Sequence, residues 1–526
     1  MATDFDAAIV GSGFGGAVAA CRLAEAGYRV VMLERGRRWH RQDYPSISRK
    51  NWIWNELDPV RDHGWLDIRH FGTIATIAGA GVGGGSLHFA NVVIDAQPDL
   101  FDEGWPSEIT FAGLAPYYQK VSDVLEPRKI PSNQFSNRTK LLKEAATNAG
   151  FGAQYDEVEL AVTFNDDYAY DASREPRAGD SIERPNADGV QQGFCVHLGQ
   201  CDLGCPVDAR NTVAVNYIPR AERHQADVRP LHVVRSVEGL GDGYRIHFDR
   251  IDNGGLRPGS LTARIVVAAA GSIGSTELLL RCRDQHRTLR HISSTLGTRW
   301  SSNGNYLSPA VHRGRKVYPG RGPTITAGIR FFGANTHNGQ HVMIEDGGVP
   351  DLLDEYRDEL SNPRGDANRF GGLLRALYRV LEREPVEELM PWFAQGRDIP
   401  SGTFRLQRRF LGLLGRDVLR LSWDPSNARQ VLDAIHELHR TLAGTTGGRI
   451  LLQPPDAPIT PHPLGGCPMA ESATDGVVDH RGEVFGHHNL YVADGSILPR
   501  PVGHNPSKTI AALSERIADI IVHEGK

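Results

Sequence analysis

The sequence predicts an α/β protein in which a discontinuous, Rossmann-type domain is joined to an α+β domain built on an antiparallel sheet. Three observations predict this fold. Residues 7–34 follow the order strand, glycine turn, helix, strand, and residues 264–282 repeat a buried strand, a small-residue turn and a helix. Residues 301–459 instead contain alternating stretches such as PTITAGIRFF, which are typical of half-buried antiparallel strands. The strand–turn–helix pattern indicates a mostly parallel sheet. The alternating stretches indicate an antiparallel sheet and so mark a second domain.

The composition favours a small-molecule partner. The 526 residues include 58 basic and 63 acidic side chains, a near balance that argues against nucleic acid as a partner and against general attraction to anionic membranes. The first residues, MATDFDAAIV, lead straight into an apolar strand without a signal-peptide pattern. No apolar run reaches the ~18–20 residues that a bilayer requires. We therefore expect a cytoplasmic protein with at most transient membrane contact.

The glycine turn that follows residues 7–10 predicts a dinucleotide site. Gly11 allows the tight turn, Gly13 lets the backbone approach a pyrophosphate, and Gly16 lets the helix pack on the strand. The N-terminus of that helix adds the positive end of its dipole. Glu34 ends the second strand at the distance where a carboxylate accepts hydrogen bonds from ribose hydroxyls. An acid at this position disfavours a 2′-phosphate on the ligand.

Two further segments allow more than one interpretation. The cysteines at 195, 201 and 205 have the spacing C-x5-C-x3-C, which fits neither the paired C-x2-C of structural zinc nor the common iron–sulfur runs. We interpret them as ordinary packed thiols, with a metal site as the alternative. Residues 373–383 have helical periodicity, which indicates a core-facing helix with a solvated face or, alternatively, a lid or a membrane-touching entrance.

The last 65 residues bring together groups suited to oxidising an alcohol. His462 lies in the turn HPLGGC, and an imidazole can take the hydroxyl proton of an alcohol as its hydride leaves. Asn505 is a plausible N-cap of the helix that follows, and Pro506 fits the first turn of that helix. A helix N-terminus stabilises nearby negative charge, such as that of a reduced flavin ring. Cys467, by contrast, is predicted to be a packing residue.

Five motifs in this order resemble the glucose-methanol-choline (GMC) flavoprotein oxidoreductases, and among them the branch that contains cholesterol oxidases. The resemblance covers nearly the whole chain. Its motifs are VGSGFGG with Glu34, GVGGGSL at 81–87, LGTRWSSNGN at 296–305, HPLGGC at 462–467 and NLYVADGSILPRPVGHNP at 489–506.

The resemblance implies FAD as the cofactor and residues that would bind it. Gly11, Gly13, Gly16 and Glu34 would hold the ADP half of FAD. His88 stands where some family members attach FAD covalently through a histidine, whereas other members bind it without a covalent bond. The remaining implied FAD contacts are Gly83, Gly84, Ser86, Asn91, Val234, Asp494, Gly495 and Pro506. The FAD-binding domain would comprise residues 1–100, 190–300 and 460–526, and the substrate domain residues 101–189 and 301–459.

The resemblance also implies the reaction. His462, paired with Asn505, would act as acid and base while hydride passes from a secondary alcohol to flavin N5, giving a ketone. The leading substrate is a 3β-hydroxysterol or a similar bulky apolar alcohol, with oxygen or another electron acceptor reoxidising the flavin. The alternatives are a dehydrogenase of a non-steroid alcohol or sugar, and a flavin-containing lyase without net redox chemistry.

Cholesterol oxidases of this fold use a glutamate above the steroid to move a double bond after the oxidation. The acids that the sequence offers for this step are Glu345, Asp346, Glu387 and Glu388, and Glu345 is our candidate for a third catalytic residue.

Overall fold

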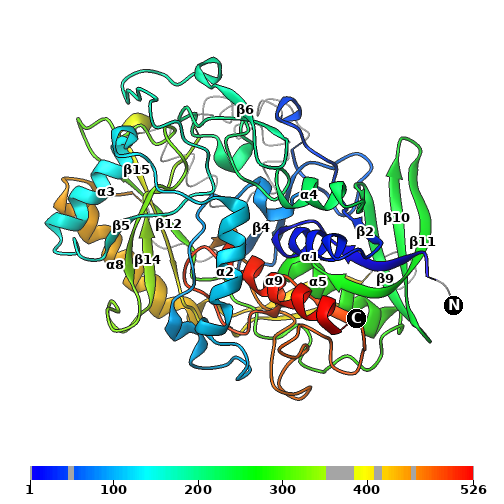
Figure 1. Cartoon of the computed structure of the whole chain (residues 1–526). Coiled ribbons are helices and arrows are strands. Elements are labelled where there is room, and N and C mark those ends of the chain that lie inside the picture. The colour runs from blue at the N-terminus through cyan, green and yellow to red at the C-terminus, as the bar shows by residue number, and fades with distance from the viewer. Residues whose placement is uncertain (1–2, 45–51, 351–383, 408–416, 452–457, 525–526) are drawn as a thin grey trace.

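The computed structural model describes residues 3–44, 52–350, 384–407, 417–451 and 458–524, and these contain two large β-sheets. In Figure 1 the antiparallel sheet stands at the left with α3 and α8 on its outer side, and the mostly parallel sheet lies to the right with α1, α5 and α9. This arrangement confirms the predicted fold class. The helix predicted at residues 373–383 lies outside the described ranges.

The seven-stranded sheet is the Rossmann-type core, with the order β8-β2-β1-β11-β10-β9 and β20 paired to β11. β8, β2, β1, β11 and β20 pair in parallel, while β9, β10 and β11 form an antiparallel meander. Three distant parts of the chain thus contribute to one sheet. Its strands are β1 (Phe5–Val10), β2 (Val30–Leu33), β8 (Asp227–Arg229), β9 (His232–Leu240), β10 (Gly243–Asp252), β11 (Gly255–Ala268) and β20 (Leu490–Val492).

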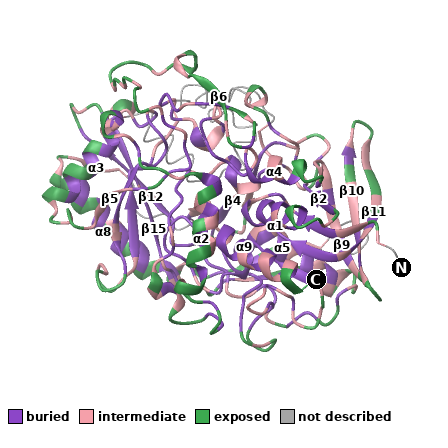
Figure 2. Ribbon diagram, viewed as in Figure 1, coloured by how far each residue is buried: buried purple, intermediate pink, exposed green. Residues whose placement is uncertain are grey.

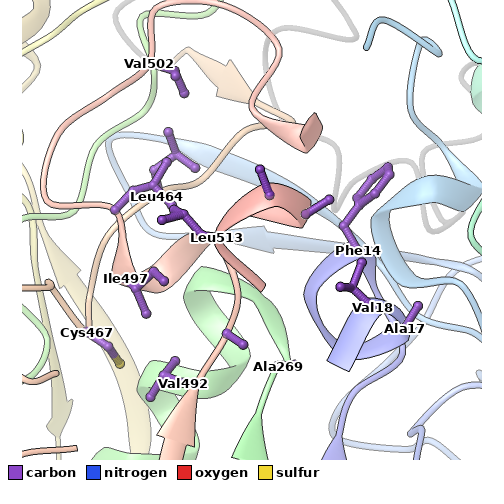
Figure 3. Packing of buried hydrophobic residues seen from close by; sticks show 14 of the residues in the cluster. Phe14, Ala17, Val18, Ala269, Leu464, Cys467, Val492, Ile497, Val502 and Leu513 are labelled. Carbon is purple, nitrogen blue, oxygen red and sulfur yellow. The ribbon is translucent and has the colours of Figure 1, made fainter. Parts of the chain in front are cut away.

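Helices from both ends of the chain pack together beside this sheet. The Arg22 guanidinium on one helix donates to the Glu515 carboxylate on another, and Tyr217 donates to the same carboxylate. Figure 3 shows the apolar side of this region, where buried residues from both ends of the chain lie close together. The helices are α1 (Phe14–Glu25), α2 (Phe111–Leu125), α4 (Tyr217–Arg223), α5 (Gly271–Leu280) and α9 (Ser507–Glu524).

The second large sheet has six strands in the order β18-β12-β15-β14-β13-β5, all antiparallel. It confirms the antiparallel sheet expected from the alternating stretches. α3 (Asn137–Asn148) and α8 (Arg429–Thr445) pack on it and expose their outer faces (Figure 2). Its strands are β5 (Tyr155–Glu157), β12 (Tyr306–Val311), β13 (Ala327–Phe331), β14 (Val342–Glu345), β15 (Leu389–Gly396) and β18 (Arg449–Ile450).

Three small sheets complete the described structure. One of them pairs β19 in parallel with β4, which brings the segment before His462 beside the strand that leads into the second glycine run. The small-sheet strands are β3 (Leu66–His70), β4 (Ala75–Gly79), β19 (Ile459–Thr460), β6 (Glu183–Pro185), β7 (Gln191–Gly193), β16 (Thr403–Gln407) and β17 (Val418–Ser422). No helix within the described ranges is both long and apolar enough to cross a membrane.

Candidate active site

A single cavity of about 1280 Å³ is lined both by the glycine turns beside the seven-stranded sheet and by the antiparallel sheet. Most of the predicted site residues line it, although they come from distant parts of the sequence. These residues are Gly11, Gly13, Glu34, Gly84, His88, Val234, His462, Asp494, Gly495, Asn505 and Pro506. Gly16, Gly83, Ser86, Asn91 and Glu345 are not among its lining residues.

The two glycine runs touch each other at one part of the cavity. Gly11 has a φ of +96°, and a Cβ there would lie 2.5 Å from the Ala269 carbonyl oxygen. A Cβ on Gly84 would lie 2.5 Å from the Gly13 Cα, whereas a Cβ on Gly13 would meet nothing closer than 3.9 Å. Gly11 and Gly84 are therefore required by the packing of the chain on itself. Gly13 instead leaves its backbone open toward the cavity, as a close-lying ligand requires.

Glu34 is held by the turn that it faces. Its carboxylate accepts hydrogen bonds from the Ser12 hydroxyl at 2.6 Å, the Ser12 amide at 3.1 Å and the Gly36 amide at 2.9 Å. Burial raises the pKa of this carboxyl, while the hydrogen bonds oppose that shift. The acid is thus fixed at the edge of the cavity, in a position suited to the hydroxyls of a ribose.

Other predicted cofactor residues shape the same region. Asp494 accepts from the Gly271 amide and the Ser275 hydroxyl, which ties the turn after β20 to the start of α5. Ser86 donates to the Gly83 carbonyl at 2.7 Å inside the second glycine run. Asn91 has a φ of +65°, and both polar atoms of its side-chain amide are buried without a hydrogen bond among the described residues.

The hydrogen bonds around His462 fix its tautomer. The Asn305 amide nitrogen donates to the Ser302 carbonyl at 2.7 Å, so its other amide atom is the oxygen. That oxygen lies 2.9 Å from His462 Nδ1 and can only accept, so Nδ1 carries the proton. Nε2 is then the unprotonated nitrogen, and no hydrogen bond to it occurs within the described part of the chain. The imidazole is ready to accept a proton there.

The loop of residues 301–305 holds both active-site turns. Thr460 accepts from the Asn305 amide and from the His462 backbone amide, which steadies the histidine turn. Asn303 accepts from the Gly503 amide at 2.8 Å and donates to the His504 carbonyl at 2.9 Å, which steadies the turn before Asn505. One short loop therefore sets the distance between His462 and Asn505. Neither Asn303 nor Asn305 was among the predicted site residues, although both lie in the motif LGTRWSSNGN.

Burial keeps the histidines of the site neutral. It lowers the pKa of His462 and of His504 to about 3 and that of His88 to about 4. His88 and His504 further disfavour a positive charge on His462. The Nε2 atoms of His88 and His504 are buried, with no hydrogen-bond partner among the described residues.

Asn505 does not cap α9, which corrects the expectation from the sequence. The helix begins at Ser507, and the Asn505 side-chain oxygen is buried with no hydrogen bond in the described structure. The physical reason is the turn held by Asn303, which places Asn505 in the wall of the cavity rather than at the first amides of the helix. A side-chain oxygen without a partner at a cavity wall is available to a ligand.

Glu345 is the last residue of β14 and is not among the residues that line the cavity. Gln395 donates to one of its oxygens at 2.7 Å, and the other oxygen is buried without a partner among the residues described. Burial raises the pKa of Glu345 to about 8. Asp346 accepts the amides of Thr326 and Ala327 and is satisfied. Glu345 therefore differs from Asp346 in having one carboxyl oxygen without a hydrogen-bond partner among the described residues.

The other two candidate acids, Glu387 and Glu388, form an ion pair and a looser contact, respectively, with Lys316.

The cysteines have the character expected of packed thiols. Cys195, Cys201 and Cys205 are all free, and the first two are buried. Burial raises the pKa of Cys205 to about 11 and that of Cys467 to about 12. Cys467 is completely buried in the apolar cluster of Figure 3, as predicted.

Comparisons with known proteins agree on one family. A family model described as GMC oxidoreductase matches residues 416–514, and one described as an NAD(P)-binding Rossmann-like domain matches residues 9–39. The cholesterol oxidase of Mycobacterium tuberculosis is 31% identical over 100% of this chain and 92% of its own length. That of Acinetobacter baumannii is 29% identical over 98% of this chain and 94% of its own.

A solved structure shares the fold. The crystal structure of pyridoxine 4-oxidase from Mesorbium loti superposes with a TM-score of 0.62 at 18% sequence identity, covering 98% of this chain and 99% of that one.

Proposed function

The chain belongs to the GMC oxidoreductase family of FAD-dependent alcohol oxidoreductases, and on this premise we propose that it oxidises a secondary alcohol to a ketone, with His462 as the acid–base residue. The observation that carries the proposal is the neutral imidazole of His462, whose Nδ1 proton is held by Asn305 and whose Nε2 is left free at the cavity. We further propose a 3β-hydroxysterol, or a similarly bulky apolar alcohol, as the substrate.

The residues around the glycine turns fit FAD. The backbone at Gly13 is open toward the cavity, Glu34 is fixed at its edge, and the buried Nε2 of His88 has no partner within the described chain. We propose that residues 1–100, 190–300 and 460–526 form the FAD-binding domain and that the predicted cofactor residues hold FAD in it. Bound FAD would supply the two-electron acceptor that takes hydride from the alcohol carbon.

His462 would move the proton of the alcohol. Its Nε2 is unprotonated throughout the physiological pH range because burial holds the pKa of the ring at about 3. As Nε2 takes the hydroxyl proton, positive charge develops on the ring, and the Asn305 oxygen at Nδ1 stabilises that charge. Asn505 adds a second polar side chain at the same cavity wall, so the two residues together would orient the hydroxyl group.

The cavity wall supports an apolar substrate. The antiparallel sheet contributes Leu307, Pro309 and Phe393 to the lining, and Ile325 adds to the same surface. Apolar walls with few polar groups favour ligands that bury hydrocarbon. The relatives named cholesterol oxidase support a sterol in particular. We propose residues 101–189 and 301–459 as the substrate domain.

Glu345 is our candidate for a subsequent double-bond shift. Its spare buried oxygen and raised pKa of about 8 suit a carboxyl that takes and returns a proton in an apolar setting. With a 5-ene-3β-hydroxysterol as the substrate, a Glu345→Gln variant should release the unconjugated ketone. Release of only the conjugated ketone, as judged by its ultraviolet absorbance, would remove Glu345 from this role.

An anaerobic substrate panel tests the proposed function. Sterols, terpenoid alcohols, sugars and aryl alcohols are mixed with the FAD-loaded protein, and loss of the flavin absorbance identifies the substrate. Admitting air then separates an oxidase, which recovers its absorbance and forms peroxide, from a dehydrogenase, which needs another acceptor. Bleaching by sugars alone would favour the non-steroid dehydrogenase. Turnover without any flavin change would favour the lyase, and a panel without bleaching or turnover would overturn the proposal.

A further inference from the structure

Two polar side chains of the cavity wall have no role in the site described above. Asp202 and Thr324 both belong to the cavity wall. The Thr324 hydroxyl oxygen is buried and has no hydrogen-bond partner among the described residues, although only 6% of this residue is exposed. The Asp202 carboxyl lies near enough to this hydroxyl for the hydroxyl to lower its pKa, but the two groups do not reach hydrogen-bonding geometry. Buried polar groups without partners are uncommon in folded proteins, and a missing ligand is one cause.

The directions of the antiparallel strands place Thr324 and Asn305 toward opposite ends of the sheet. Tyr306, Ala394, Ile344 and Ile329 form one row across the sheet. Asn305, which holds His462, directly precedes β12, and Thr324 lies three residues before the start of β13, which runs in the opposite direction to β12. The residues just before β12 and the residues just before β13 therefore lie toward opposite ends of the sheet. Thr324 thus lies toward the opposite end of the sheet from the loop that holds His462, and Asp202 interacts with Thr324.

The wall between the two ends is apolar. Leu307 and Pro309 follow Asn305 at every second position of β12 and so share its face of the sheet. Phe393 pairs with Leu307 from the neighbouring strand and also lines the cavity. A ligand that spans the cavity would thus meet a polar end, an apolar middle and a second polar end. An elongated hydrocarbon with a polar group at each end matches this order.

The charges near Asp202 select for a neutral group. Burial raises the pKa of its carboxyl to about 6, and the guanidinium groups of Arg210 and Arg138 oppose that shift. Arg210 is 4% exposed and donates to the Ser86 and Leu87 carbonyls. Arg138 donates to several carbonyls, including that of Thr324. Two buried cations beside the carboxylate disfavour a third positive charge on the ligand. A hydroxyl therefore fits better than a protonated amine.

We propose that Asp202 and Thr324 bind a second hydroxyl group of the substrate, at the end opposite to the alcohol that His462 faces. The substrate class is then an elongated apolar skeleton with a hydroxyl at each end, such as a sterol with a hydroxylated side chain. This inference rests on the proposed function for the location of the reacting alcohol. The alternative is that Asp202 only balances the charge of Arg210 and Arg138.

Binding of two unreactive ketones tests the inference separately from turnover. The probes are the 3-ketone of cholesterol and the same ketone with a hydroxyl at the end of its side chain, titrated into the FAD-loaded protein by calorimetry. A hydrogen bond to a charged group contributes about 10- to 100-fold in affinity, so the parent should prefer the hydroxylated ketone by about that factor. Asp202→Leu should abolish the preference. Thr324→Val, which keeps the shape of the side chain, should reduce it several-fold.

Asp208→Asn provides the matched control, because Asp208 belongs to the same loop but is not among the residues lining the cavity. It should leave the preference unchanged. An equal affinity of the parent for both ketones, or a preference that survives in both Asp202→Leu and Thr324→Val, would overturn the inference, as would failure of either ketone to bind. If no alcohol bleaches the flavin but the preference for the hydroxylated ketone persists, the result would instead count against the proposed function.

Discussion

The glycine turns and the His462 site form parts of one cavity but are built in different ways. The glycine turns are held by backbone packing: a Cβ on Gly11, Gly16 or Gly84 would overlap another part of the backbone. The His462 site is held by side-chain amides, since Asn303 and Asn305 tie two distant turns to one loop. At these three glycines the first region therefore tolerates no added side-chain volume. The second depends on donors and acceptors rather than on space.

Adding one methyl group to Gly11 should have the largest effect. In Gly11→Ala the new Cβ would lie 2.5 Å from the Ala269 oxygen, and the φ of +96° strains any side chain. We expect the variant to be destabilised by at least about 2 kcal/mol and to lose its FAD. Thermal unfolding and the flavin-to-protein absorbance ratio measure the two effects.

Gly13→Ala is the matched comparison. A Cβ at this position would meet nothing in the chain closer than 3.9 Å, so the fold should melt within a few degrees of the parent. If the backbone of Gly13 approaches a bound pyrophosphate, the variant should nevertheless lose most of its FAD. Normal FAD content in this variant would show that Gly13 does not approach the cofactor.

Removing the imidazole tests the side-chain-built region. His462→Ala should keep its FAD, because the glycine turns are untouched, but should slow anaerobic bleaching by about 10²-fold or more, the scale expected on losing a general base. Stopped-flow absorbance measures this rate. An unchanged rate would exclude His462 from proton transfer.

Asn305 should have a smaller effect that acts through His462. Asn305→Leu removes the acceptor at Nδ1, so both tautomers become available and bleaching should slow by about 10-fold. Asn305→Asp places a carboxylate at the same atom, which favours the protonated ring and raises the pKa of His462. The pH below which bleaching slows should therefore be higher in Asn305→Asp than in the parent. Equal pH profiles would contradict this assignment.

Glu345 should produce the smallest change, and it should depend on pH. The pKa of its carboxyl is about 8 in the folded protein against an ordinary 4.5, so the unfolded chain holds fewer protons between these values. Stability from this group is complete below pH 4.5 and is lost as the pH rises toward 8. Glu345→Gln removes this titration. The melting temperature of the variant minus that of the parent should therefore rise by a few degrees between pH 5 and pH 8. A constant difference would refute the raised pKa.

The sequence predicted the structure of the glycine turns better than that of the His462 site. The strand, turn and helix around Gly11 and the acid at Glu34 lie within 30 residues, and their spacing is set by the local geometry of one β-α-β unit. The pattern could therefore be recognised before any tertiary information. The N-cap expected at Asn505 was wrong, because the hydrogen bonds from Asn303 that hold its turn come from about 200 residues away.

By itself, the sequence determined the α/β fold class, the glycine turns and the membership of the family, and it singled out His462 as the candidate acid–base residue. These depend on local periodicity, on glycines that a turn requires, and on motifs that are contiguous in the chain. Only the tertiary structure decided which tautomer His462 adopts, that Asn303 and Asn305 hold the site, and that Asp202 and Thr324 share its cavity. Those relations join residues more than 100 positions apart, and a hydrogen bond or a shared cavity between such residues leaves no periodic pattern along the chain.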